Sequence, residues 1–326
     1  MLRPSSSAAL GVFISSFLFI GSVLAQEQTA TVTPAIAGVV AAGTRIELIK
    51  EGFSGTEGPI ALPDGSLLFT ENQANRVIKI AVDGTVSTFL DDTNGVNSLA
   101  LSDGGELYAV QTLKPRVGIV FPADKVKMLA DNFEGAPFGR PNDLVIDKQG
   151  GIYFTDSGAP PKPDQPPPAV LPARPAVYRI TPGGNLARIA SDIERPNGIQ
   201  LSPDEKVLYV ANTNGEYVLA YDIGKDGTIG PRRNFAKLEG SRKTDAGISS
   251  GADGLAVDAK GRLYVASSLG IQVFSSQGEA LGIIALPKQP QNLAFAGIGK
   301  QLLYVVGRGA AYRIAALTAG FSGRAK

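Results

Sequence analysis

The sequence contains no histidine, no cysteine and no tryptophan. Without histidine, the chain cannot use a Ser-His-Asp or Cys-His nucleophile, a histidine general base or a histidine metal ligand. Without cysteine, it has no thiolate, no disulfide and no cysteine-ligated zinc. Any catalysis must therefore use carboxylates, amides, Lys, Arg, Tyr, Ser, Thr or a hard cation.

An excess of charge of either sign is also absent, since 31 Lys and Arg face 30 Asp and Glu. This balance gives no electrostatic reason to expect nucleic acid or an anionic membrane as a partner. The 326 residues are 44% apolar, which is enough chain for one large all-β domain or two ordinary domains.

The N-terminus has the order of a secretory signal peptide. Residues 1–25 contain Arg3, then an apolar stretch, then small residues that end at Ala25, so we expect cleavage after Ala25. The alternative is an uncleaved membrane anchor, although three serines interrupt the apolar stretch. Because the chain has no cysteine, a bacterial periplasm or secretion fits best. We expect a linker over 26–43 and one domain over 44–326.

Six segments of the remaining chain repeat one pattern of a polar residue, an apolar strand, a Gly- or Asp-rich turn and a second apolar strand. They begin 38 to 56 residues apart, at positions 57, 97, 142, 197, 253 and 291. Further strands follow in most units, and four strands per unit at this period are typical of a propeller blade. The last unit has only three strands, and residues 44–53 can supply the fourth. The pattern therefore predicts an all-β, six-bladed β-propeller; a sandwich would predict no repeat.

The polar residue of each unit stands where the chain enters the innermost strand, so the six residues should ring one mouth of the central channel. All six have a side-chain oxygen: Glu57, Asn97, Asn142, Asn197, Asp253 and Gln291. Carboxylate and amide oxygens favour a hard divalent cation, above all Ca²⁺. The alternative is that Asn-Gly and Asp-Gly pairs form turns, but Glu57 and Gln291 are not turn formers. Asn97 and Gln291 are the members expected to act only indirectly.

Four motifs resemble the gluconolactonase, senescence marker protein (regucalcin) and luciferin-regenerating family, and the resemblance extends from about residue 45 to 315. The motifs are Thr56-Glu57-Gly58-Pro59, Arg140-Pro141-Asn142-Asp143, Arg195-Pro196-Asn197-Gly198 and Ala252-Asp253-Gly254-Leu255. The resemblance implies a catalytic Ca²⁺, or another divalent cation such as Zn²⁺, Mn²⁺ or Mg²⁺, held by Glu57, Asn197 and Asp253. It places Asn142 at the metal or the substrate, makes Arg140 a substrate-binding residue and makes Asp253 the general base.

The chemistry of these residue types is consistent with the opening of a lactone or ester. A divalent cation polarises the carbonyl and lowers the pKa of a bound water, and a carboxylate takes the proton. Asp253 is the first candidate for this base, and Asp156 and Glu71 are alternatives at the ends of second strands that return to the same mouth. Arg140 can hold substrate oxygens. Its alternative role is an ion pair with Asp143 or Glu194.

Two insertions should lie at the same mouth. Residues 157–176 contain eight prolines and form a stiff lid or wall, or alternatively a loop for contact with a partner. Residues 240–251 are rich in Gly and Ser and precede Asp253.

The sequence as a whole predicts a secreted, Ca²⁺-dependent, gluconolactonase-like hydrolase that opens a sugar lactone or similar cyclic ester. Its partner is a small molecule, with no nucleic acid and no membrane after cleavage, and we expect a monomer. The alternatives are a non-enzymatic propeller that binds a ligand or a protein, and an esterase or organophosphate hydrolase that uses the same metal site.

Overall fold

The computed structural model describes residues 1, 31–160, 168–245 and 247–326. The expected signal peptide and residues 161–167 of the proline-rich insertion lie outside the described residues.

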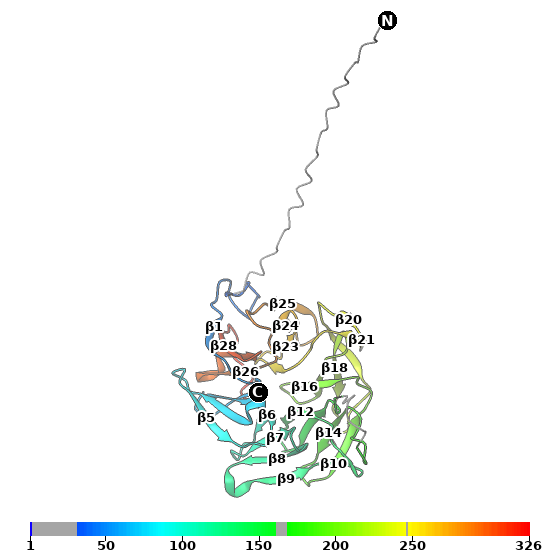
Figure 1. Cartoon of the computed structure of the whole chain (residues 1–326). Helices are drawn as coiled ribbons and strands as arrows, with labels where there is room; N and C mark the ends of the chain where they lie inside the picture. The colour runs from blue at the N-terminus through cyan, green and yellow to red at the C-terminus, as the bar shows by residue number, and fades with distance from the viewer. Residues whose placement is uncertain (2–30, 161–167, 246) are drawn as a thin grey trace.

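Six four-stranded antiparallel sheets surround a central axis (Figure 1), which confirms the six-bladed β-propeller. Each sheet is one blade, and blades are numbered in chain order. Blade 1 contains β2 (Glu57–Ala61), β3 (Leu67–Glu71), β4 (Arg76–Ile80) and β5 (Val86–Asp91). Blade 2 contains β6 (Val96–Leu101), β7 (Leu107–Gln111), β8 (Arg116–Phe121) and β9 (Lys127–Ala130). Blade 3 contains β12 (Pro141–Ile146), β13 (Ile152–Asp156), β14 (Ala176–Ile180) and β15 (Leu186–Ala190).

The second half of the ring repeats this arrangement. Blade 4 contains β16 (Pro196–Leu201), β17 (Val207–Asn212), β18 (Tyr217–Asp222) and β19 (Arg233–Lys237). Blade 5 contains β22 (Leu255–Val257), β23 (Leu263–Ser267), β24 (Gly270–Phe274) and β25 (Ala280–Ile284). Blade 6 contains β26 (Asn292–Ala296), β27 (Leu302–Gly307), β28 (Ala310–Ala315) and β1 (Glu47–Glu51).

The smaller elements lie in the connections. Two hairpins are formed by β10 (Asn132–Phe133) with β11 (Ala136–Pro137), and by β20 (Arg242–Thr244) with β21 (Gly247–Ser249). The 3₁₀ helices of the described ranges are η1 (Asn72–Ala74), η2 (Ala123–Lys125) and η3 (Ile298–Lys300). Within those ranges, no helix has the length and apolarity needed to cross a membrane.

The ring is closed by strands from both ends of the chain. β1 pairs with β28 in antiparallel register, with Glu47 opposite Arg313. The Arg313 guanidinium donates to both carboxylate oxygens of Glu47, at 2.8 and 2.9 Å. This confirms that the segment before the first repeat supplies the missing outer strand, and it covers the outer edge of β28.

A bulge recurs at the start of the innermost strand in the first four blades. In β2, the pairing with β3 shifts between Glu57 and Ile60, and in β16 the pairing with β17 shifts between Pro196 and Ile199. Equivalent shifts occur at the start of β6 and β12. A bulge inserts one extra residue and turns a side chain away from the regular alternation. Each bulge coincides with the polar residue of its repeat.

Apolar clusters fill the junctions between neighbouring blades. At the junction of blades 2 and 3, Val110 packs with Phe154 and Tyr178, whose rings stack at 5.2 Å. Complete burial of such a side chain stabilises the fold by about 1.5–3 kcal/mol. Because packing between the blades holds the ring together, the start of each innermost strand can carry polar residues.

The described part of the expected linker is packed rather than free. Ile36, Val39 and Val40 are buried in the cluster shared by blades 5 and 6. Arg262 donates to the carbonyl oxygen of Gly38 at 2.8 Å. The folded body therefore includes residues before the expected boundary at residue 44.

Candidate functional site

The six polar residues lie at the start of the six innermost strands. Glu57, Asn97, Asn142 and Asn197 are inside strands, Asp253 precedes β22 by two residues and Gln291 precedes β26 by one. The first four are therefore not turn residues, and the turn interpretation is wrong for them. Because neighbouring innermost strands contact one another around the ring, these residues share one mouth of the channel, which we call the donor mouth.

Two glycines allow the innermost strands to approach closely at this mouth. A Cβ on Gly198 would lie 2.2 Å from the carbonyl oxygen of Asp253, and a Cβ on Gly254 would lie 2.0 Å from Oδ1 of Asn292. Such distances cannot be accommodated without movement of the neighbouring blade. Because Gly198 and Gly254 have no side chain, the neighbouring innermost strands can lie close together at the donor residues.

Glu57 is a buried acid without a basic partner in direct contact among the described residues. Its Oε2 accepts from Nδ2 of Asn292 at 3.1 Å, and its Oε1 accepts from Nε2 of Gln291 at 3.4 Å. Burial and the charge of Asp143 raise the pKa of Glu57 to about 7, against the opposing effect of Asn292. A cation bound nearby would therefore stabilise the ionised form of this carboxylate.

Asp253 is the second acid of the donor mouth. Its backbone N–H donates to the carbonyl oxygen of Ala266 at 2.9 Å, which fixes the residue to β23. Burial, followed by the negative charges of Glu57 and Asp143, raises the pKa of Asp253 well above its ordinary value, and Arg195 opposes this shift. The charge of Glu57 thus disfavours ionisation of Asp253, so the two carboxylates are close enough to repel each other.

Asn197 has a buried side-chain oxygen without a hydrogen-bond donor. The residue is 6% exposed, and its Oδ1 has no hydrogen-bond donor within the described part of the chain. Its Nδ2 donates to Oγ1 of Thr213 at 3.0 Å, and Thr213 in turn donates to the carbonyl oxygen of Ala252 at 2.7 Å. An orphaned buried acceptor is costly, so this oxygen would gain from a ligand.

Asn97 and Gln291 are used to hold their neighbours. Asn97 accepts from Asn72 and donates to the carbonyl oxygen of Asn142, each at 2.8 Å. Gln291 Oε1 accepts the backbone N–H of Arg308 at 2.8 Å. The expected indirect role of these two residues agrees with these contacts, and Glu57, Asn142, Asn197 and Asp253 remain as the candidate ligand set.

Asp156 and Glu71 are bound to the loops that lead into the innermost strands. Asp156 accepts the backbone N–H groups of Gly139 and Arg140 at 2.7 Å and of Gly158 at 2.8 Å. Burial raises its pKa and these three donors oppose the rise. Burial also acts to raise the pKa of Glu71, but donors from Arg76 and Ser54 outweigh it and the net shift is downward. Both carboxylates are thus held by hydrogen-bond donors, and Asp253 as the general base stays a prediction.

The backbone N–H of Arg140 donates to Asp156, and the Arg140 side chain has no ion-pair partner in the described ranges. The two acids considered as alternatives are engaged elsewhere. Asp143 pairs with Lys326, and Glu194 accepts from Asn212 Nδ2 at 2.5 Å. The ion-pair interpretation of Arg140 is therefore not supported, and its role as a substrate-binding residue stays a prediction.

The described parts of both insertions lie beside the donor mouth, as expected. Ser157 donates to the carbonyl oxygen of Pro196, next to Asn197, at 2.6 Å. The backbone N–H of Ala173 donates to the carbonyl oxygen of Pro137 at 2.8 Å. The second insertion forms the β20–β21 hairpin, and Ser249 donates to the carbonyl oxygen of Thr213 at 3.0 Å.

Several residues of the site were not identified from the sequence. Thr213 orients Asn197, Asp143 lies beneath the donor mouth, and Arg195 acts on the charge of Asp253. Arg195 and Asp143 had a signal, because both lie in the motifs that begin with Arg-Pro-Asn, at 140–143 and 195–198, whereas Thr213 had none.

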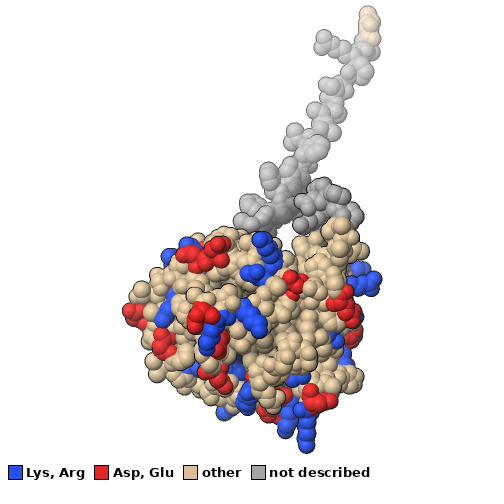
Figure 2. Space-filling view, turned by 90° about the horizontal axis from the view of Figure 1, so that it is seen from below, with Lys and Arg blue, Asp and Glu red and all other residues tan. Residues whose placement is uncertain are grey.

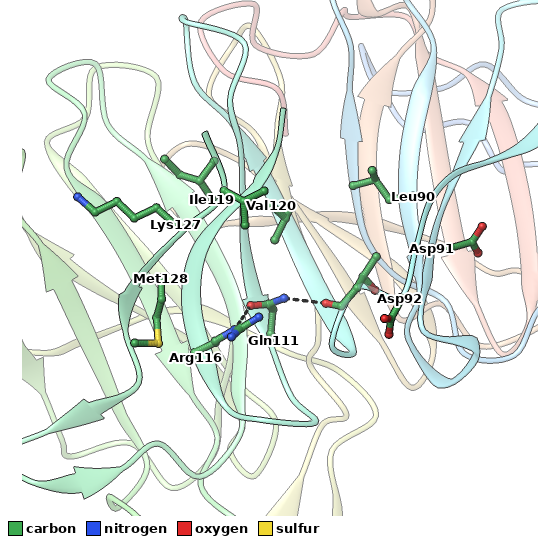
Figure 3. Close-up of a pocket in the computed structure, with 11 residues that line it drawn as sticks. Leu90, Asp91, Asp92, Gln111, Arg116, Ile119, Val120, Lys127 and Met128 are labelled. Carbon is green, nitrogen blue, oxygen red and sulfur yellow. Dashed lines mark hydrogen bonds between the residues drawn. The ribbon is translucent and has the colours of Figure 1, made fainter. Parts of the chain in front are cut away.

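Other hollows of the surface are separate from these residues. A groove of about 270 Å³ between blades 1 and 2 is lined by Leu90, Gln111, Arg116 and Met128, among others, and by none of the candidate ligands (Figure 3). On the face shown in Figure 2, acidic and basic side chains are interspersed.

The donor set fits a hard divalent cation. It combines two carboxylates whose charges repel with an orphaned amide oxygen, and such oxygens are the ligands that Ca²⁺ prefers. In the described ranges, no group of three or more His, Cys, Asp or Glu residues could hold a metal. A cation here would therefore depend on amide oxygens as well as on Glu57 and Asp253.

The fold and the donor mouth define a six-bladed propeller with oxygen donors at one end of its channel. The family described as SMP-30/gluconolactonase/LRE-like matches residues 55–308, and the chain belongs to this family. A gluconolactonase of Zymomonas mobilis is 29% identical over 304 residues, which cover 84% of this chain and 82% of that protein.

Two solved structures share the propeller fold of this chain. A gluconolactonase from Xanthomonas campestris has a TM-score of 0.74 at 26% identity, with 88% of this chain and 97% of that chain covered. The calcium-binding protein regucalcin from Agrobacterium tumefaciens shares the fold, with a TM-score of 0.69 at 17% identity over 85% of this chain and 95% of that chain.

Proposed function

We propose that this protein is a hydrolase that opens a sugar lactone or a similar cyclic ester with the help of a divalent cation, Ca²⁺ first. The observation that carries the proposal is the orphaned Oδ1 of Asn197 beside two carboxylates of raised pKa. Membership of the family and the 29% identity to a gluconolactonase support the reaction class.

Each residue has a role that follows from its chemistry. Glu57, Asn142, Asn197 and Asp253 would hold the cation, which when bound would supply Lewis acidity toward the lactone carbonyl. Asp253 takes the proton from the attacking water, and its raised pKa brings it closer to the working range of a general base. The Arg140 guanidinium binds substrate oxygens through its donor fork. The water oxygen bonds to the carbonyl carbon, the ring C–O bond breaks, and the proton taken by Asp253 passes to the departing ring oxygen, which gives the ring-opened hydroxy acid.

The proposal is tested with the purified protein and glucono-δ-lactone. Hydrolysis is followed by proton release before chelation, after chelation, and after addition of Ca²⁺, Mg²⁺, Mn²⁺ or Zn²⁺. We expect chelation to abolish activity and one of these cations to restore it. Full activity after complete chelation would contradict the dependence on a cation.

Two alternatives are separated by the same experiment. A panel that adds an aryl ester and an organophosphate triester identifies an esterase or an organophosphate hydrolase by its preference among these substrates. A protein that hydrolyses no member of the panel but binds a lactone is a non-enzymatic binding propeller.

We also propose export to the periplasm or beyond the cell, with cleavage after Ala25. The charged, apolar and small residues at the N-terminus support this. Intact mass measurement of the protein from a periplasmic extract should give a chain that begins at Gln26. A full-length chain in the membrane fraction would favour the anchor. For the mature protein we propose a monomer, which light scattering tests.

A further inference from the structure

The last residues of the sequence occupy the channel from the side opposite to the donor mouth. Arg324 donates to the carbonyl oxygens of Leu201, at 2.6 Å, and Ser202, at 3.1 Å. The N–H of Ala61 donates to the carbonyl oxygen of Ala325 at 2.7 Å. Leu201 and Ala61 end the innermost strands that begin near Asn197 and Glu57. The C-terminus accordingly lies at the centre of the ring (Figure 1).

Within the channel, the ammonium group of Lys326 pairs with Asp143. The Lys326 side chain is 4% exposed and that of Asp143 is 1% exposed. Asp143 also accepts from Oγ of Ser98 at 2.5 Å and from the backbone N–H groups of Leu144 at 2.9 Å and Ile199 at 3.2 Å. Its carboxylate is thus fixed by protein contacts on blades 2, 3 and 4 and has one basic partner.

Three side-chain carboxylates share the channel with this ammonium group. They are Glu57, Asp143 and Asp253. The charge of Asp143 raises the pKa of both Glu57 and Asp253, and that of Lys326 lowers both. The four groups therefore interact through the same poorly screened interior, where a buried charge requires a counter-charge.

We propose that Lys326 is a positioning residue that cancels the charge of Asp143, so that Asp143 adds no net negative charge to that of Glu57 and Asp253 at the donor mouth. The proposal rests on the function proposed above. Loss of the Lys326 ammonium group makes the channel more negative by one unit charge, which favours a trivalent ion over a divalent one.

The experiment compares Ca²⁺ with Tb³⁺ by calorimetry at pH 8 in the wild type, in Lys326→Met, in Asp143→Asn and in the double variant. The measured quantity is the ratio of the Tb³⁺ affinity to the Ca²⁺ affinity. We expect this ratio to rise on the order of tenfold in Lys326→Met and to fall by a similar factor in Asp143→Asn, because one unit charge nearby attracts the trivalent ion more strongly. In the double variant the ratio should return to the wild-type value.

Lys288→Met is the matched control. Lys288 pairs with Glu51 and is 39% exposed, so solvent screens its loss and the ratio should not change. Equal ratios in all variants, or a shift in the same direction in both single variants, would overturn the proposal for Lys326 alone.

Failure of the wild type to bind Ca²⁺, Mg²⁺, Mn²⁺ or Zn²⁺ would overturn the proposed cation site and this proposal together. Circular dichroism checks the fold of each variant. If Lys326→Met does not fold, the fall in Asp143→Asn and the recovery in the double variant decide the question.

Discussion

Asn292 donates its side-chain amide to Oε2 of Glu57 at 3.1 Å, and this contact joins the innermost strand of the last blade to that of the first. The two residues are 235 positions apart in the sequence. The contact thus ties the closure of the ring to the orientation of a candidate ligand. It also explains why a glycine is needed at position 254, whose Cβ would collide with Asn292.

We predict that Asn292→Ala lowers the free energy of unfolding by about 1–3 kcal/mol, because a buried carboxylate loses its donor. The cation affinity should fall as well, since Glu57 is then free to turn. Urea denaturation and calorimetry measure the two effects. Asn185→Ala, at an exposed position, should change neither. An unaltered cation affinity in a destabilised Asn292→Ala would show that the contact serves ring closure alone.

Asp253→Asn tests the base. We expect kcat for lactone hydrolysis to fall about 100-fold or more, since the amide cannot accept the proton, and the cation affinity to fall because one negative charge is lost. Steady-state kinetics at saturating cation separates the two effects. Asp245→Asn makes the same substitution at an exposed residue of the adjacent insertion and should retain wild-type activity. Near-normal kcat in Asp253→Asn would exclude this residue as the base.

Cation binding should depend on pH through Glu57. Its pKa is raised to about 7, so below pH 7 a proton competes with the cation and above pH 7 it does not. The affinity should therefore rise about tenfold or more from pH 6 to pH 8. In the cation-free protein the sign is opposite. Because the pKa is raised above its ordinary value, stability is lost as the pH rises from about 4.5 to 7. Calorimetry and thermal unfolding measure the two curves.

Glu57→Gln is the control for this pH dependence, since it carries no titrating group at that position. It should make both curves shallower over the same interval, and Asp253, whose pKa is also raised, accounts for the slope that remains. A wild-type affinity that is constant from pH 6 to pH 8 would contradict the assignment of Glu57 as a ligand.

Asp156→Ala distinguishes a holding role from proton transfer. It leaves three backbone N–H groups without their acceptor, so we expect a loss of about 2–4 kcal/mol in the free energy of unfolding. KM should rise more than kcat falls, because Arg140 loses the anchor of its backbone. A fall in kcat as large as that of Asp253→Asn, with KM unchanged, would instead make Asp156 the base.

Much of this structure could be predicted from local pattern. The repeat of strands and turns predicted six blades, and the short last repeat predicted closure by the segment before Glu57. The polar residue at the start of each innermost strand predicted the donor mouth. Each of these inferences needs only the alternation of residues along a strand and the knowledge of where a strand begins.

What could not be predicted depends on contacts between distant segments. Residues 319–326 carry no periodic pattern, and the pair of Lys326 with Asp143 spans 183 positions. Asp156 and Glu71 looked available because their strands end at the donor mouth. Their hydrogen bonds to backbone N–H groups of the preceding loops are not visible in any local pattern, and neither is Thr213 beneath Asn197.

The bulges at the start of the innermost strands allow the direction of the donor side chain to be set independently of the direction of the core-facing side chains. In a regular strand, one determines the other, because alternation fixes which residues face the core once any one of them is set. The extra residue after Glu57, and likewise after Asn142 and Asn197, shifts the alternation of side chains by one position. The donor at the tip of a blade can consequently be exchanged during evolution while the packing of Ile60, Leu144 and Ile199 stays the same, so one scaffold can acquire new ligand sets without rebuilding its interior.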